Sequence, residues 1–94
     1  MRGSLVVRLY IAGDSPNSVR AVANLRAALA ELAHSPDEVQ IVDVLTTPGR
    51  GLSDGVLVTP MLVRVSPLPE RRILGNLSDR TMLQGVLAGG SRDG

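Results

Sequence analysis

The chain of 94 residues contains no cysteine, lysine, tryptophan or phenylalanine, and Tyr10 is its only aromatic residue. Without cysteine, disulfides, thiolate zinc sites, iron–sulfur clusters and cysteine nucleophiles are excluded. One aromatic side chain provides no platform for stacking nucleic-acid bases. A formal net charge of +1 also gives little attraction to nucleic acid or to an anionic membrane. We therefore expect no metal, cofactor, nucleic acid or membrane among the partners.

Long hydrophobic runs are also missing. No apolar segment approaches the roughly 20 residues that span a bilayer, and the first residues do not have the pattern of a secretory signal. We expect a cytoplasmic protein that forms one domain over residues 1–94, with a flexible Gly-rich tail at 89–94. Its core must be aliphatic, because the hydrophobic content of 44% is almost free of aromatics.

The first half of the chain predicts a strand, a helix and a second strand. Residues 5–11 and 39–45 are nearly continuous in apolar and β-favouring residues, as buried strands are. Between them, Ser15 is a good helix cap and Pro16 suits the first helical position. An apolar stripe at helical spacing follows, formed by Val19, Val22, Leu25, Leu29 and Leu32. This succession predicts two parallel strands joined by a helix, with the first strand central.

The second half predicts a weak segment, two strands and a helix. Three glycines and one proline in residues 46–55 favour a loop with at most a short helix. Residues 61–65 and 71–74 predict antiparallel strands joined by a proline-containing turn. Ser78 is placed to cap a last helix over 79–87, which Gly85 weakens. The order βαβαββα around a central mixed sheet is an α/β, thioredoxin-like fold.

The sequence lacks the chemistry that this scaffold usually carries. The loop that would hold a reactive cysteine pair is Ser15-Pro16-Asn17-Ser18, and Thr59-Pro60 follows at the distance of a cis-proline turn. Serine catalysis needs an oriented base, and the only histidine, His34, lies beyond the far end of the helix. Asp43, flanked by apolar residues, is either an acid with a raised pKa or, as we favour, a residue at an inter-strand edge or a partner for an arginine. The scaffold therefore favours binding over catalysis.

Five blocks of sequence resemble the KaiB family of bacterial circadian clock proteins. They occur in the family's order and cover roughly residues 5–87. The blocks are Leu9-Tyr10-Ile11-Ala12-Gly13, Ser15-Pro16-Asn17-Ser18-Val19-Arg20, Ile41-Val42-Asp43-Val44-Leu45, Val58-Thr59-Pro60-Met61-Leu62 and Arg71-Arg72-Ile73-Leu74-Gly75-Asn76-Leu77-Ser78.

The resemblance implies a non-enzymatic clock protein that binds the N-terminal ATPase ring of a hexameric KaiC and regulates its phosphorylation or output. It also implies a metamorphic fold switch between a monomeric thioredoxin-like state and a ground state, βαββααβ, that forms a homotetramer. Local patterns in this chain favour the thioredoxin-like state. The alternative function is a thioredoxin-like adaptor, or a sensor-type domain of a clock output histidine kinase, outside the core clock.

The resemblance also suggests which residues act. It implies partner contacts for Arg8, Arg20, Arg71 and Arg72, and the alternative is that these arginines are solvated or pair with Asp14, Asp43 or Glu70. Six residues are expected to have structural or fold-switching roles: Ser15, Pro16, Asn17, Pro60, Ser78 and Gly85.

Overall fold

The computed structural model describes residues 4–88, and the predicted tail at 89–94 lies outside them. The elements follow the predicted order βαβαββα, rather than the alternative βαββααβ. They are β1 (Val6–Ile11), α1 (Pro16–Ala30), β2 (Glu38–Asp43), α2 (Pro48–Ser53), β3 (Met61–Ser66), β4 (Arg71–Leu74) and α3 (Arg80–Leu87). None of the helices within residues 4–88 combines the length and apolar character that a membrane crossing requires.

The four strands form one mixed sheet in the order β2-β1-β3-β4. β1 runs parallel to β2 and antiparallel to β3, which confirms that the first strand is central. The prediction of a second buried strand is wrong, because β2 is an edge strand. Val39 and Ile41 are exposed, whereas Val42 is buried.

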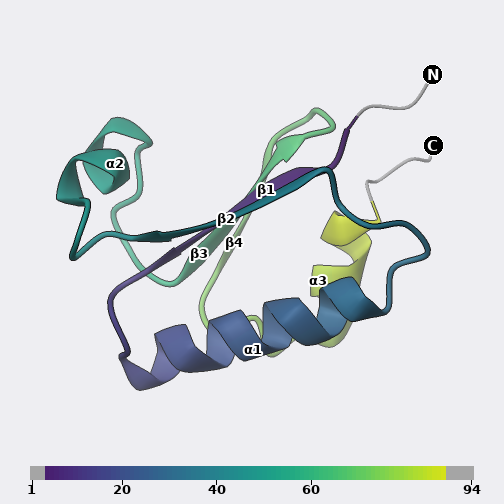
Figure 1. Cartoon of the computed structure of the whole chain (residues 1–94), viewed down its shortest axis with the longest axis horizontal. Helices are drawn as coiled ribbons and strands as arrows, with labels where there is room; N and C mark the ends of the chain where they lie inside the picture. The colour runs from purple at the N-terminus through teal and green to yellow at the C-terminus, as the bar shows by residue number, and fades with distance from the viewer. Residues whose placement is uncertain (1–3, 89–94) are drawn as a thin grey trace.

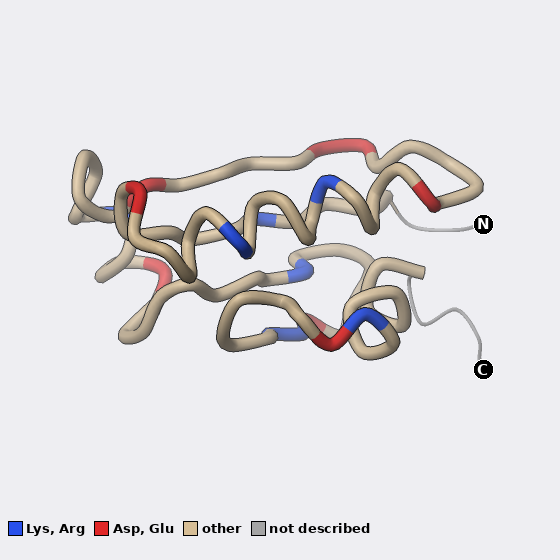
Figure 2. Tube along the Cα trace, turned by 90° about the horizontal axis from the view of Figure 1, so that it is seen from below, with Lys and Arg blue, Asp and Glu red and all other residues tan. Residues whose placement is uncertain are grey.

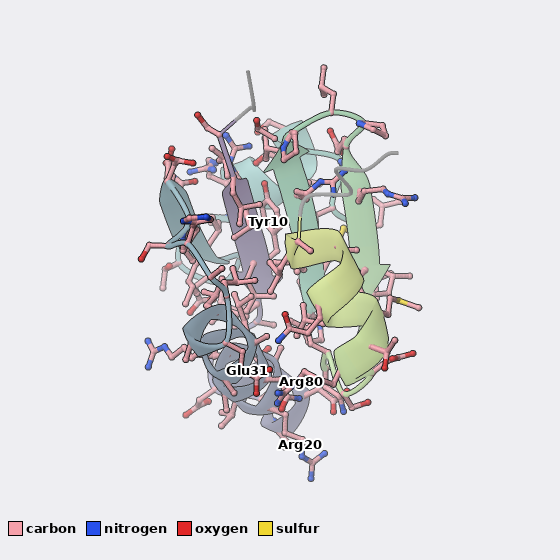
Figure 3. The ribbon with its side chains drawn as sticks, turned by 90° about the vertical axis from the view of Figure 1, so that its right-hand side faces the viewer. Tyr10, Arg20, Glu31 and Arg80 are labelled. Carbon is pink, nitrogen blue, oxygen red and sulfur yellow. The ribbon has the colours of Figure 1, made fainter. Side chains whose placement is uncertain are left out.

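Helices α1 and α3 cover one face of this sheet (Figure 1). The main core lies between them and the sheet, and Leu9, Leu25, Leu62 and Leu83 are completely or almost completely buried there. At the surface the two helices are joined through Glu31, whose carboxylate accepts hydrogen bonds from Arg80 (3.1 Å) and Gln84 (2.7 Å). Figure 3 shows the side chains of Glu31 and Arg80 pointing toward each other.

The buried side of α1 differs from the predicted stripe. Its buried residues are Ser18, Ala21, Leu25 and Ala28, and Val19 is 54% exposed. Three of these four side chains are small. A stripe defined by the large apolar residues therefore lies beside the face of α1 that packs on the sheet. Leu25 was correctly placed, and Val22, Leu29 and Leu32 pack at the margin of the core.

The opposite face of the sheet is covered only in part. A smaller cluster of buried residues lies there, formed by Tyr10, Val42, Val56, Met61 and Val63. The short helix α2, which confirms the expectation for residues 46–55, lies near the end of β2 on this side (Figure 1). We call this side the open face. Because side chains alternate along a strand, Arg8 and Arg72 point to the open face.

The cap of α3 is Asp79 and not Ser78. The Asp79 carboxylate accepts a hydrogen bond from the Met82 N–H at 3.0 Å, while Ser78 is one residue too early to do so. The turn before α3 is held instead by Asn76, whose side-chain oxygen accepts a hydrogen bond from the Ser78 N–H. Both residues are good caps by type, so composition alone could not choose between them.

Candidate protein-interaction site

The loop between β1 and α1 is held by two serines. Ser15 occupies the N-cap position and Pro16 is the first helical residue, as predicted, but the Ser15 side chain makes no capping bond. It donates to Ser18 Oγ at 2.9 Å, and Ser18 Oγ accepts from the Ala12 N–H at 3.0 Å. Ser18 is buried, whereas Asn17 is exposed. The hydroxyls therefore fix the loop.

Thr59-Pro60 lies at the same end of the sheet, because Met61 pairs with Tyr10 near the end of β1. The peptide bond before Pro60 is cis, and the Pro60 carbonyl accepts from the Gly75 N–H at 2.9 Å. Pro60 thus serves as a structural turn that connects the start of β3 to the end of β4.

Asp43 joins two turns, and within residues 4–88 it makes no ion pair with an arginine. Its Oδ1 accepts from the Gly13 N–H (3.0 Å) and from the Leu45 N–H (2.9 Å). The expected edge position is confirmed, because Asp43 ends the edge strand β2, whereas the alternative of an arginine partner is wrong for the described residues, because the carboxylate turns toward backbone N–H groups next to its own strand end. Gly13 has φ +58°, and an added Cβ would lie 3.1 Å from Leu45, so a side chain there is strained.

The serines of the β1–α1 loop have no histidine partner. Ser18 Oγ contacts only a backbone N–H and another hydroxyl, and His34 is exposed beyond the end of α1. Within residues 4–88 there is no cluster of three or more His, Asp or Glu side chains able to hold a metal ion.

The four predicted contact arginines do not form one patch. Arg8 and Arg72 share the open face and both reach the turn after α2. Arg8 Nη1 lies 3.9 Å from Asp54 Oδ2, and Arg72 Nη2 donates to the Asp54 carbonyl at 3.0 Å. Arg72 also pairs with Glu70 at 2.8 Å, which was the alternative expected for it.

Arg71 points to the face of the sheet that α1 and α3 cover. It is the register partner of Arg64 across β3 and β4. Arg64 is only 2% exposed, and it donates to the carbonyls of Val86 (3.0 Å) and Pro69 (2.8 Å). Burial, and then the charge of Arg71, lower the pKa of Arg64. Arg71 itself is exposed and has no ion pair among residues 4–88. It is thus the arginine of β4 that is free to meet a partner.

Helix α1 carries two further arginines without an ion pair in the described part of the chain, Arg20 and Arg26, and both are exposed. Its residues Pro16–Ala30 include no Asp or Glu. Figure 2 shows basic segments along this helix and acidic segments only beside its ends. Figure 3 shows Arg20 pointing away from the molecule. A shallow groove of about 340 Å³ runs along α1 from Ile11 to Arg26, past the exposed Val19. This surface can offer cations and apolar contact together.

Asp54 is the charged centre of the open face. The Tyr10 hydroxyl donates to its Oδ2 at 2.5 Å, and Arg50 Nε lies 3.5 Å from the same oxygen. The hydrogen bond from Tyr10, with smaller help from the charges of Arg50 and Arg8, lowers the pKa of Asp54. Burial first, and then the Asp54 contact, raise the pKa of Tyr10.

Sequence reasoning missed Asp54, Arg50 and Arg64. The i, i+4 spacing of Arg50 and Asp54 could have indicated an ion pair if residues 48–54 had been read as helical. The alternation of residues 61–66 could have indicated that Arg64 shares a face with Leu62. The burial of Arg64 under α3 depends on tertiary packing, for which the sequence carries no local signal.

Comparison with known proteins supplies the family. A family model described as the KaiB domain matches residues 8–88. The circadian clock oscillator protein KaiB of Synechococcus elongatus is 43% identical over 79 residues, covering 84% of this chain and 78% of that protein. Among solved structures, the N-terminal domain of Synechococcus elongatus SasA superposes with a TM-score of 0.75 at 25% identity, covering 97% of this chain and 88% of that one.

The fold is also that of thioredoxins. Fasciola hepatica thioredoxin superposes with a TM-score of 0.73 at 21% identity, covering 92% of this chain and 80% of that one. This likeness concerns the architecture alone, because the cysteine chemistry is missing here. The chain has the thioredoxin-like fold and belongs to the KaiB family of circadian clock proteins.

Proposed function

We propose that this protein is a non-enzymatic clock component that docks on the N-terminal ATPase ring of a KaiC-like hexamer in the cytoplasm and regulates its phosphorylation or output signalling. The match to KaiB over residues 8–88 carries the proposal. Two features of the molecule support it. The cysteine-free loop offers no redox chemistry, and the exposed cations Arg20 and Arg71 suit an acidic protein surface.

Binding to a purified KaiC-type hexamer tests the proposal. We expect the wild-type chain to bind over hours, and Arg20→Glu to weaken binding at least tenfold at low salt, because it places a like charge against an acidic face. Arg20→Lys is the matched control, since it keeps the positive charge at the same position and should weaken binding less than Arg20→Glu. Absence of binding by a folded wild-type chain would remove the clock partner.

The proposal includes a fold switch, with a monomer in the described state and a homotetramer in the other. Gly85 lies within α3, and nothing lies within 4 Å of a Cβ added there. Gly85→Ala should therefore favour the state in which α3 is helical by up to about 1 kcal/mol. Backbone chemical shifts of residues 80–87 should show a minor strand-like population in the wild type that shrinks in the variant. A single helical population in both proteins would contradict the switch.

A second candidate function is an interaction domain of sensor type, working as an adaptor or with a histidine kinase outside the core clock. The superposition on the SasA N-terminal domain favours it. The same binding assay separates the two candidates: a folded chain that ignores the ATPase ring but binds a clock output kinase fits the second. A KaiC-like reading frame beside the gene would support the first.

A further inference from the structure

Three polar groups of the open face converge on a single oxygen atom. Asp54 Oδ2 lies 2.5 Å from the Tyr10 hydroxyl, 3.5 Å from Arg50 Nε and 3.9 Å from Arg8 Nη1. Hydrogen bonds between a guanidinium and a carboxylate are about 2.7–2.9 Å long. The hydroxyl is thus fully engaged, while both guanidinium groups are held near the carboxylate without bonding to it.

Arg8 is the least satisfied of these groups. It lies in the central strand, its Nε is buried without a hydrogen-bond partner, and Asp54 is its only ion-pair partner within residues 4–88. Arg50 bonds to the Gln40 side chain at 3.3 Å through Nη2, which leaves its Nε directed at Asp54. A buried donor without a partner is costly, so the Arg8 side chain is poised to donate to a better-placed acceptor.

The backbone that carries Asp54 is fastened independently of its carboxylate. Arg72 donates to the carbonyls of Asp54 (3.0 Å) and Gly55 (3.3 Å) and is itself held by Glu70. The side chain of Asp54 can therefore rotate away while the turn stays on the sheet. The side chains of Asp54 and Arg8 are 25% and 33% exposed, so an incoming group reaches them without opening the core.

We infer that Arg8, Arg50 and the Tyr10 hydroxyl form a carboxylate-binding site that Asp54 fills in the free protein, and that an acidic side chain of a protein partner replaces Asp54 on docking. A carboxylate is the expected ligand because one already sits there. Its replacement frees no core residue and leaves the turn in place. The inference rests on the proposed function, since it assigns to the same partner a second contact, with a built-in competitor, on the open face, away from Arg20 and Arg71.

Asp54→Asn tests the competitor directly. Asparagine keeps the size of the side chain and an oxygen for Tyr10, but it removes the charge that competes with the partner. We expect this variant to bind the ATPase ring three- to tenfold more tightly than the wild type. Arg8→Gln should weaken binding at least fivefold.

Glu70→Gln is the matched control. It removes a more exposed carboxylate (47% against 25% for Asp54) that also pairs with an arginine near the same turn, and it makes the same change in net charge. Its affinity should stay within twofold of the wild type. If Asp54→Asn binds no more tightly than Glu70→Gln, the gain is general electrostatics and the inference is wrong.

A second measurement needs no ATPase ring. A peptide of four glutamates, with blocked termini and free side-chain carboxylates, is titrated into the ¹⁵N-labelled protein at low salt. The arginine Nε–Hε resonances are followed by NMR. The Arg8 and Arg50 signals should move further in Asp54→Asn than in Glu70→Gln. Equal shifts in the two variants, or equal shifts with inorganic phosphate, would overturn the assignment of a carboxylate site.

The two measurements separate the failure of the inference from the failure of the proposed function. A wild-type chain that ignores the ring, together with peptide shifts that depend on Asp54, would reject the clock partner and keep the site. A wild-type chain that binds the ring, together with equal affinities for Asp54→Asn and Glu70→Gln, would keep the partner and reject the site.

Discussion

Arg64 ties together three elements through one side chain. It rises from β3, reaches the last turn of α3 at the Val86 carbonyl, and reaches the β3–β4 connection at the Pro69 carbonyl. A cation near the C-terminal end of a helix also interacts favourably with the helix dipole. The cost of burying this guanidinium is offset only while both carbonyls remain in place. The stability that Arg64 contributes therefore depends on α3 staying packed on the sheet.

We therefore predict that Arg64→Met lowers the free energy of unfolding by about 2–4 kcal/mol, because it leaves two carbonyls without their donor. Arg64→Lys keeps the charge but cannot span both carbonyls, and it should cost less, about 1–2 kcal/mol. Urea unfolding followed by circular dichroism measures both. A methionine variant as stable as the wild type would show that apolar packing replaces the anchor fully.

Because Tyr10 is the only tyrosine and the chain has no tryptophan, its ionisation can be measured by absorbance without a signal from other residues. Its pKa is raised in the folded state, so the stabilisation from neutral Tyr10 is complete below about pH 10 and is lost as the pH rises through the raised pKa. Absorbance at 295 nm should show the phenolate forming at a higher pH in the folded than in the urea-unfolded chain. Asp54→Asn should lower this folded midpoint, and an unchanged midpoint would contradict the Tyr10–Asp54 bond.

The stabilisation that Asp54 contributes has the opposite pH dependence to that of Tyr10. The pKa of Asp54 is lowered, so its stabilising contribution is complete above about pH 4 and is lost as the pH falls through the lowered value. The Tyr10–Asp54 contact is thus intact throughout the neutral range, and neutral pH changes do not empty the carboxylate site.

Among single residues, the sequence was a reliable guide to backbone roles and a weaker one to side-chain partners. Pro16 and Pro60 lie where their restricted backbone predicts a helix start and a turn. The partner of Arg8 could not be predicted, because Asp54 is brought to it by the packing of α2 on the sheet. Local rules fix the first kind of residue, whereas tertiary structure selects the second.

At the scale of elements, α3 shows how one hydrogen bond decides where a helix begins. Helices of this length are marginal alone, so capping and packing contribute much of their stability. Asp79 supplies the cap and Leu83 and Leu87 supply the packing.

Asp79→Ala should lower the free energy of unfolding by about 1 kcal/mol, since the Met82 N–H loses its acceptor. Ser78→Ala, one residue earlier, is the control and should change it by less than about 0.5 kcal/mol. Chemical denaturation of the two variants under the same conditions gives the comparison. A larger loss for Ser78→Ala would place the cap where the sequence had suggested.

The existence and order of the elements were predictable because each strand and helix carries its own period and its own end signals. The burial of β2 was not, because a largely apolar run such as residues 39–45 is compatible with a central or an edge position. Position within the sheet depends on which strands follow later in the chain. The small residues that line α1 were missed for a related reason, since alanine gives little periodic contrast.

For the whole molecule, the sheet order predicts how stability is distributed. β1 and β3 are flanked on both sides by other strands, whereas β2 and β4 are edges and α2 is a short helix over the open face. Regions with fewer buried contacts open at lower free energy.

Native-state hydrogen exchange should therefore show the slowest amides in β1 and β3, intermediate protection in α1, and the fastest helical exchange in α2. Two-dimensional NMR after transfer to deuterated buffer measures these rates. Uniform protection across the chain would contradict this distribution and indicate a single cooperative unit.

The split of Arg71 and Arg72 across β4 has a consequence for how the chain tolerates changes in length. Strand side chains alternate, so shifting β4 by one position would turn Ile73 out of the core and bring a guanidinium in. Extra residues between Pro67 and Glu70 would be absorbed by the hairpin connection. One residue inserted between Arg72 and Ile73 would reverse the two sides of the strand's end, so deletions and insertions in this family should avoid that bond.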